Sequence, residues 1–302
     1  MPLAPRVVVV HRRSELDELV DRHGTRGQVE FFLRGRGRGL GEVQARHDAL
    51  VLARRRVAAA VPQGWRTASA ERADLDRFAF EPQDVVVAVG QDGLVANAAK
   101  YLDGQPVVGV DPEPGQHPGV LVPHPADAVG ALLTAAADGR ARCRPLTMVR
   151  ATADDGQHLD ALNELYLGHP THQSARYVVR AGGPVAERQS SSGVVVGTGT
   201  GATGWCRSLA AERSSPLALP RADDPELAWF VREAWPSPTT RTTLTEGLLG
   251  PDDALEVVVE SESLVVFGDG LEADRLVPVW GQTVRLHRSP RVLRHVVGAG
   301  GR

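Results

Sequence analysis

The stretch "VVVAVGQDGLVANAAKYL", residues 85–102, decides the fold class of this chain. Its start belongs to the β-branched run 84–89, which predicts a strand buried on both faces. A short turn with Gly90, Asp92 and Gly93 follows, and 94–102 then has the composition of a helix. A strand, a tight turn and a helix in this order form one repeat of a parallel α/β sheet.

The same alternation extends through the first half of the chain. Two further apolar runs predict buried strands, at 6–10 and 106–110. Helical spacing of apolar residues predicts helices at 14–24, 42–61 and 125–139. The first of these begins at Ser14 as its N-cap and ends at Gly24. The first half is therefore expected to be an α/β domain with a Rossmann-like parallel sheet.

The second half has a different pattern, with short strand-like segments separated by Gly, Pro, Asp and Ser. These segments include "LTMVRATA", "HLDALNELYLG", "SARYVVRAGG", "SGVVVGT", "ELAWFVREAW", "ALEVVVES", "LVVFGDG" and "QTVRLHR". Such a pattern is typical of antiparallel sheets. The sequence therefore predicts an α/β domain over residues 1–141 and an all-β-rich C-terminal domain over residues 142–302.

Composition limits the classes of function. The chain has 302 residues and a net charge of −3, so no overall positive field favours nucleic acid or an anionic membrane. The "RGRGRGLG" stretch, 34–41, could bind RNA, but it is short and lacks interleaved aromatics, so we favour a mobile loop. No signal peptide or membrane span is expected, and Cys143 and Cys206 are expected to be reduced thiols in a cytoplasmic protein.

The turn at Gly90, Asp92 and Gly93 is a candidate phosphate site. Backbone N–H groups and the helix dipole favour anions at a helix N-terminus, so a triphosphate could bind there. The alternative is a plain structural turn, because Asp-Gly pairs are common in turns for reasons of backbone geometry alone.

Two stretches after the domain boundary favour the first interpretation. The first, "LNELYLGHPTHQSARYVV" at 162–179, contains Asn163 and Glu164, which could otherwise be exposed polar residues at a strand end. The second, "SSSGVVVGTGTGATGW" at 190–205, is rich in glycine and threonine. Such a loop lets backbone approach a ligand closely and offers hydroxyl groups, although it could also be a flexible glycine loop.

In this order the motifs resemble the NAD kinase family. "GQDGL", "PVVGVDPEPGQHPGVL", "LNE" and "SSGVVVGTGTGATGW" correspond to the family's Gly-Gly-Asp-Gly-Thr motif, its next segments, its Asn-Glu pair and its Thr/Gly/Ser-rich loop. The Thr-Gly-Thr-Gly form, with "ARYVV", "VREAW" and "FGDG", is more similar to the mitochondrial-type branch. The resemblance covers about residues 80–288 and implies a two-domain NAD kinase-like fold.

The resemblance implies a phosphotransferase that uses ATP with Mg²⁺ on the nucleotide, and no metal held by the protein. Asp92 would be the general base that accepts the proton of the adenosine ribose 2′-hydroxyl of NAD(H). The other implied contacts are the phosphate path at Gly90 and Gly93, the dinucleotide at Asn163 and Glu164, the adenine side at Thr198, Thr200 and Gly201, and the nicotinamide side at Ser192.

The resemblance also implies a shared cleft and a homodimer. The Asp92 turn and the 163–205 segments come from different halves, so the ligand is expected between the two domains. Family members associate through the β-rich domain, where Trp229, Phe230 and Trp235 are candidate interface aromatics, although a strand this apolar could equally be core.

Several residues depart from the family pattern. Gln91 replaces the second glycine and Leu94 the threonine, and Ala202 and Gly204 are smaller than the usual residues. Two alternatives to an NAD kinase therefore stay open: a kinase of the same fold acting on another nucleoside or polyol, and a non-catalytic dinucleotide-binding protein. Lipid kinases share a similar glycine motif, but the chain has no amphipathic membrane stretch. The sequence does not decide whether the acceptor is NAD or NADH, or whether the phosphoryl donor is ATP or polyphosphate.

Overall fold

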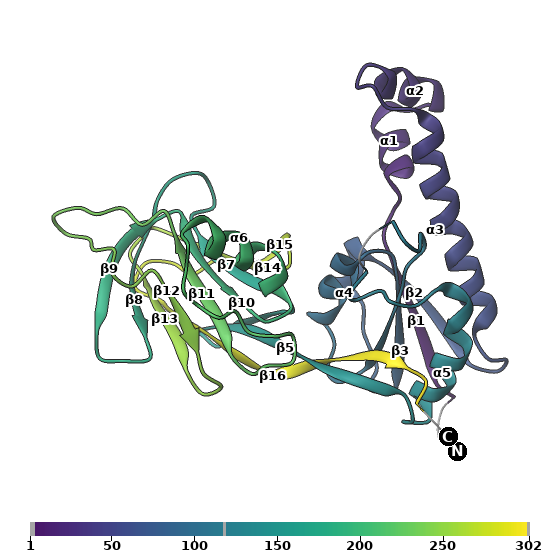
Figure 1. Ribbon diagram of the computed structural model, residues 1–302. Coiled ribbons are helices and arrows are strands. Elements are labelled where there is room, and N and C mark those ends of the chain that lie inside the picture. Colours follow the sequence, from purple (N-terminus) through teal and green to yellow (C-terminus); the bar gives the residue numbers. More distant parts are fainter. Residues whose placement is uncertain (1–3, 117–118, 301–302) are drawn as a thin grey trace. The chain divides into compact units, whose positions relative to one another are not determined.

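The contacts of the chain divide it into two compact units. The computed structural model describes residues 4–116 and 119–300. One unit takes in the chain up to Arg144 and again from Arg294 onward, and the other is Pro145–Leu293. Two long strands, β5 (Arg142–Ala153) and β16 (Thr283–Gly298), pass from one unit into the other (Figure 1).

The first unit is built on a parallel sheet. Its strands are β1 (Arg6–His11), β2 (Arg66–Glu71), β3 (Asp84–Val89) and β4 (Pro106–Val110). The strand order is β2-β1-β3-β4, and the end of β16 adds a further parallel strand that pairs Arg294 and His295 with β4. The predicted α/β class and parallel sheet are therefore confirmed.

Helices cover both faces of this sheet. The helical segments are α1 (Glu15–His23), α2 (Arg26–Arg34), α3 (Leu40–Ala60), η1 (Arg72–Arg77), α4 (Asp92–Ala99), η2 (Ala126–Ala128) and α5 (Val129–Ala137). Val85, Val87 and Val89 of β3 pack with α3 and α5 in one apolar cluster. Successive side chains of a strand face opposite sides, so Val86 and Ala88 lie on the other face, where α4 contacts the sheet. This double cover explains the unbroken apolar sequence of β3.

The Arg-Gly stretch is the connection between α2 and α3. Helices α1 and α2 pack against the start of α3 through a small apolar cluster beyond the sheet (Figure 1). Arg38 makes two hydrogen bonds to the Glu15 carboxylate, of 2.5 and 3.0 Å, and the guanidinium of Arg36 lies 3.7 Å from the centre of the Phe32 ring. These arginines therefore have partners inside their own helical bundle.

The second unit consists mainly of antiparallel strands. They are β6 (His158–Ala161), β7 (Glu164–Gly168), β8 (Ala175–Ala181), β9 (Ala186–Ser191), β10 (Gly193–Gly197), β11 (Leu227–Arg232), β12 (Glu246–Leu249), β13 (Ala254–Val259), β14 (Val265–Gly268) and β15 (Leu271–Leu276). One sheet has the order β12-β11-β10-β7-β14-β15, and the β16-β13-β8-β9 strands belong to another. The segment 158–168, expected as one strand, is two strands separated by Leu162 and Asn163.

The aromatics expected at a dimer interface lie mostly in the core of this unit. Side chains of β10 and β11 alternate between the core shared by the two sheets and the helix α6 (Trp205–Glu212), which follows the short η3 (Gly201–Thr203). Trp229 points into the shared core and Phe230 packs under α6, and they are 3% and 0% exposed. The expectation that they form an interface is wrong, because each is already buried in its own chain. Only Trp235, 68% exposed, stays available.

Candidate active site

The turn between β3 and α4 is built around two glycines with different surroundings. A Cβ atom on Gly90 would lie 3.0 Å from Cδ2 of Leu94, so a larger residue there would require the Leu94 side chain to shift. A Cβ atom on Gly93 would meet nothing within 4 Å, and the φ angle of Gly93 is not positive. Neither packing nor backbone geometry therefore accounts for Gly93, which leaves the first turn of α4 bare toward open space.

Asp92, the first residue of α4, holds a neighbouring loop through its carboxylate. Oδ1 accepts a 2.8 Å hydrogen bond from the Leu121 amide, and Oδ2 accepts a 3.0 Å bond from the Val120 amide. An ionised carboxylate has about four lone-pair positions. These two bonds orient the group and leave room for a further hydrogen bond on each oxygen.

The two departures from the family turn fit the local structure without strain. Gln91 is the N-cap of α4, with φ −99° and ψ 168°, a conformation open to any residue. Its side chain is exposed, and its Oε1 accepts a 3.3 Å hydrogen bond from Arg12. Leu94 is 3% exposed and is part of the core beneath the turn. Both residues are therefore accommodated without distorting the backbone that carries Asp92.

A cavity of about 150 Å³ lies next to this turn. It is lined by Arg12, Ser14, Glu15, Arg46, Leu50, Gly90, Gln91, Pro112 and Glu113. Arg12 follows β1 and Gly90 follows β3. β2 and β3 lie on opposite sides of β1, so the strand order reverses at this point. Ligands of open α/β sheets bind at such a reversal of strand order, outside the carboxyl ends of the strands.

The lining of this cavity favours an anion. Arg12 and Arg46 are exposed and carry fixed positive charge, and Arg46 also forms an ion pair with Glu42 at 2.9 Å. The charge of Glu15 is balanced by Arg38, whereas Glu113 opposes the arginines. Sequence reasoning missed the two arginines, because only the sheet order brings the end of β1 and the middle of α3 to the Gly90 turn.

In the second unit, Asp269 holds the bend that carries Asn163 and Glu164. Its carboxylate accepts hydrogen bonds from the Leu162 amide at 2.8 Å and the Asn163 amide at 2.7 Å. Asp269 has φ +54°, a left-handed conformation that aspartate tolerates better than most residues. Asp269 belongs to the "FGDG" motif that contributes to the resemblance, but the sequence alone did not predict that its carboxylate holds this bend.

The threonine and glycine residues expected around the adenine surround the same bend. The hydroxyl of Thr198 donates to the Leu162 carbonyl at 2.6 Å, and the Thr198 amide donates to the Asn163 carbonyl at 2.9 Å. A Cβ atom on Gly201 would lie 2.1 Å from that carbonyl oxygen, so the loop can approach only as glycine. Oγ1 of Thr200 is buried and has no hydrogen-bond partner among the described residues.

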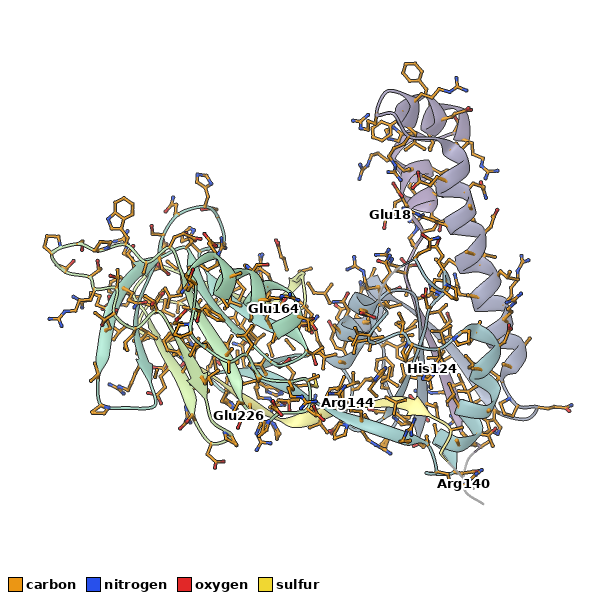
Figure 2. The ribbon with its side chains drawn as sticks, in the orientation of Figure 1. Glu18, His124, Arg140, Arg144, Glu164 and Glu226 are labelled. Carbon is orange, nitrogen blue, oxygen red and sulfur yellow. The ribbon has the colours of Figure 1, made fainter. Side chains whose placement is uncertain are left out.

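Glu164 is a carboxylate whose surroundings disfavour its charged form. Burial, with a smaller contribution from the negative charge of Asp269, raises the pKa of Glu164 from 4.5 to about 7. In the ranges 4–116 and 119–300, no ion pair or hydrogen bond from its side chain offsets this burial. Burial and the nearby Glu164 also raise the pKa of the Cys206 thiol to about 12, so this cysteine is an unreactive neighbour. Figure 2 marks Glu164 among the side chains of the β-rich unit.

Ser192 lies apart from these residues. It is in the turn that precedes β10, where its carbonyl accepts a 2.7 Å hydrogen bond from the Tyr166 hydroxyl. Thr198 follows the other end of β10, and Glu164 pairs with Gly197 at that end. A five-residue strand, roughly 17 Å long at the usual rise, separates the two ends. The unit therefore brings Asn163, Glu164, Thr198, Thr200 and Gly201 together and leaves Ser192 at a distance.

The described residues contain no group of three or more His, Cys, Asp or Glu side chains that could hold a metal ion. Among the helices of residues 4–116 and 119–300, none is long and apolar enough to cross a membrane.

Comparison with known proteins finds two similar NAD kinases. No protein-family model matches the chain. It is 29% identical over 228 residues to an NAD kinase of Halobacterium salinarum, an alignment that covers 71% of this chain and 76% of the relative. It is 22% identical over 224 residues to an NAD kinase of Chlorobaculum tepidum, covering 73% and 72% of the two chains. Both alignments extend over more than two thirds of each partner, so the chain is similar to NAD kinases over most of its length.

Proposed function

We propose that this protein is an ATP-dependent NAD kinase that phosphorylates the 2′-hydroxyl of the adenosine ribose of NAD(H). The observation that carries this proposal is the Asp92 carboxylate, oriented by two amides at the bare first turn of α4 and beside an arginine-lined cavity. The family relationship supplies the reaction, a phosphoryl transfer to a hydroxyl group.

In the proposed mechanism Asp92 is the general base. Its carboxylate accepts the proton of the 2′-hydroxyl while that oxygen forms a bond to the γ-phosphorus of ATP. The bond from the γ-phosphorus to the bridging oxygen breaks, and ADP leaves with its electron pair. Such transfers depend mainly on positioning and on stabilisation of charge over the phosphate oxygens.

The remaining residues position the two substrates. Backbone N–H groups at Gly90 and Gly93, with Arg12 and Arg46, would bind the phosphates of ATP, whose Mg²⁺ is bound by the nucleotide. The Asn163 side-chain amide would donate and accept hydrogen bonds at the adenine and the ribose hydroxyls, and the ionised Glu164 carboxylate would accept them. The unpartnered Thr200 hydroxyl supports the same role, because a buried hydroxyl gains from a ligand that pairs with it.

The relaxed backbone of Gln91 favours catalysis over a purely binding role. A non-catalytic protein would be the better proposal if Gln91 distorted the turn, but its backbone is extended and its side chain is turned to Arg12. Phosphoryl transfer from ATP-Mg²⁺ into NAD, NADH, nucleosides and inositols, measured by mass spectrometry, tests the proposal. NADP(H) is the expected product, and a phosphorylated nucleoside or inositol instead would replace NAD kinase by a related kinase.

We also propose a homodimer associated through the β-rich unit. Trp235 is 68% exposed, and a large aromatic side chain of this kind is enriched at protein interfaces. Light scattering at micromolar concentration should give twice the mass of 32.3 kDa. A monomer at that concentration would contradict the proposal, and Trp235→Ser is expected to weaken the dimer.

A further inference from the structure

The loop that binds Asp92 is fixed from three sides within the first unit. On one side β4 approaches it so closely that a Cβ atom on Gly109 would lie 1.8 Å from the Leu121 carbonyl oxygen. On a second side, the Asp92 carboxylate accepts hydrogen bonds from the amides of Val120 and Leu121. The third side is the end of β16, which pairs with β4.

Two histidine side chains connect this loop to the end of β16. Nε2 of His295 lies 2.9 Å from the Leu121 carbonyl oxygen, and Nε2 of His124 lies 2.8 Å from the Val296 carbonyl oxygen. A carbonyl oxygen can only accept, so both imidazoles carry a proton on Nε2 and donate it. Figure 2 marks His124 in the first unit.

His295 is the more deeply buried of the two connections. It is 3% exposed, and burial lowers the pKa of its imidazole below the ordinary 6.5. Among its charged surroundings, His124 and Arg144 also lower this pKa, and Asp92 raises it. The side chain is therefore a neutral hydrogen-bond donor near pH 7. Leu121 is consequently held at both of its backbone groups, the amide by Asp92 and the carbonyl by His295.

We propose that His295 is a positioning residue for Asp92, acting through the backbone of Leu121. This inference rests on the proposed function, in which Asp92 is the general base. With the Leu121 carbonyl fixed, the Leu121 amide holds Oδ1 of Asp92 in one place. Without the imidazole the loop can shift, and a displacement of about 1 Å at a reacting group can cost about 100-fold in rate.

The test compares three variants in steady-state kinetics. His295→Leu removes the donor and is expected to lower kcat by about 10- to 100-fold, with KM for ATP and NAD changed by less than about 3-fold. His295→Gln places an amide N–H near the original Nε2 position and is expected to stay within about 3-fold of the parent kcat. His124→Leu removes a hydrogen bond of the same kind without touching Leu121, and its kcat should be unchanged.

A second measurement does not depend on catalysis. Amide hydrogen exchange at Leu121 should be faster by about 10-fold or more in His295→Leu, and unchanged in His124→Leu. If the parent protein lacks kinase activity, the proposed function fails, and the exchange at Leu121 still decides whether His295 fixes this loop. Unchanged exchange and kcat in His295→Leu would overturn the inference. So would equal losses of kcat in His295→Leu and His124→Leu that follow their melting temperatures.

Discussion

Asp92 and Asp269 make the same kind of hydrogen bonds in different units, Asp92 from the first turn of a helix and Asp269 from a turn with φ +54°. Each precedes a glycine, and the carboxylate of each accepts hydrogen bonds from two consecutive backbone amides, 120–121 and 162–163. A hydrogen bond to a charged group contributes about 1.5–3 kcal/mol. Both Asp-Gly pairs are therefore structural devices, and only the surroundings of Asp92 add a chemical role.

This double role changes what Asp92→Asn should do. An asparagine keeps one acceptor oxygen, but its NH₂ group would face an amide N–H, so one of the two hydrogen bonds is lost and replaced by repulsion. We expect kcat to fall by about 10²- to 10⁴-fold, as is typical when a general base is removed. We also expect the free energy of unfolding to fall by about 1–3 kcal/mol. Kinetic assays and thermal unfolding of the same preparations measure both.

Asp269→Asn is the matched control for Asp92→Asn, because it loses a hydrogen bond of the same kind in the other unit. The two variants should unfold at similar temperatures. If Asp92→Asn keeps the kcat of the parent despite this loss of stability, Asp92 acts only as a structural clamp.

Glu164 should make stability depend on pH. Its pKa is raised to about 7 from 4.5, so the folded protein favours the protonated form. The stability from that proton is fully present below pH 4.5 and is lost as pH rises through about 7. Glu164→Gln removes the buried charge, so this variant should be more stable than the parent at pH 8 and bind NAD more weakly. Thermal unfolding at pH 5 and pH 8 and calorimetric titration with NAD check this.

The outcome at pH 8 separates a ligand-binding carboxylate from a structural one. A Glu164→Gln variant that is less stable than the parent at pH 8 would mean that the charge stabilises the fold. In that case the argument that Glu164 is retained for a ligand would be wrong.

At the scale of elements, α4 carries a glycine that its own stability does not need. Alanine is favoured over glycine in helices by up to about 1 kcal/mol, and a Cβ atom on Gly93 would meet no other atom. Gly93→Ala should therefore raise the free energy of unfolding slightly. It should also raise KM for ATP or lower kcat, because the methyl group enters the space proposed for the phosphates. Chemical denaturation and initial rates measure the two effects.

Gly27→Ala is the control for that substitution. Gly27 is also the second residue of its helix, α2, and a Cβ atom there would likewise meet nothing within 4 Å, but Gly27 lies away from the turn. It should give the same small gain in stability with unchanged kinetics. If kcat and KM for ATP are the same in the two variants, Gly93 is not part of a phosphate site.

The success of sequence reasoning differed between elements for physical reasons. Strands buried on both faces, such as β3 and β4, have unbroken apolar sequences and were placed at their observed bounds. Ser14, predicted as an N-cap, likewise marked the start of α1. β2, with the sequence RTASAE, was missed because it lies at the edge of the sheet and buries only Ala70. α6 was missed because its eight residues follow a glycine-rich run and bury only two side chains.

The candidate site could be predicted only where one segment carries it. Asp92, Asn163 and Glu164 belong to short motifs, so their resemblance to a family was enough to select them. Arg12, Asp269 and His295 act through contacts with residues distant in the chain. Those contacts follow from strand order, which local sequence patterns do not encode.

At the scale of the whole molecule, the last strand belongs to both units. The sequence of β16 continues without interruption from the β-rich unit into the parallel sheet of the first, so no compositional change marks the transition at Arg294. A chain truncated after Leu293 loses the pairing with β4 and both histidine connections to the end of β16. The first unit should then be destabilised, while the second keeps its own strands.

Hydrogen exchange followed residue by residue measures this effect. In the truncated protein we expect faster exchange in β4 and at Leu121, with β10 and β11 unchanged. Faster exchange in β10 and β11 as well would mean that the end of β16 stabilises both units.

The return of β16 to the first unit also sets an order of events during protein synthesis. His295 follows Asp92 by 203 residues (295 − 92) in the chain. At about 5–20 residues per second, the ribosome needs roughly 10–40 s to travel that distance. Throughout this interval the nascent parallel sheet lacks a strand, and the loop opposite Asp92 lacks its histidine donor. The nascent chain can therefore hold a folded β3–α4 turn well before that turn has its final geometry.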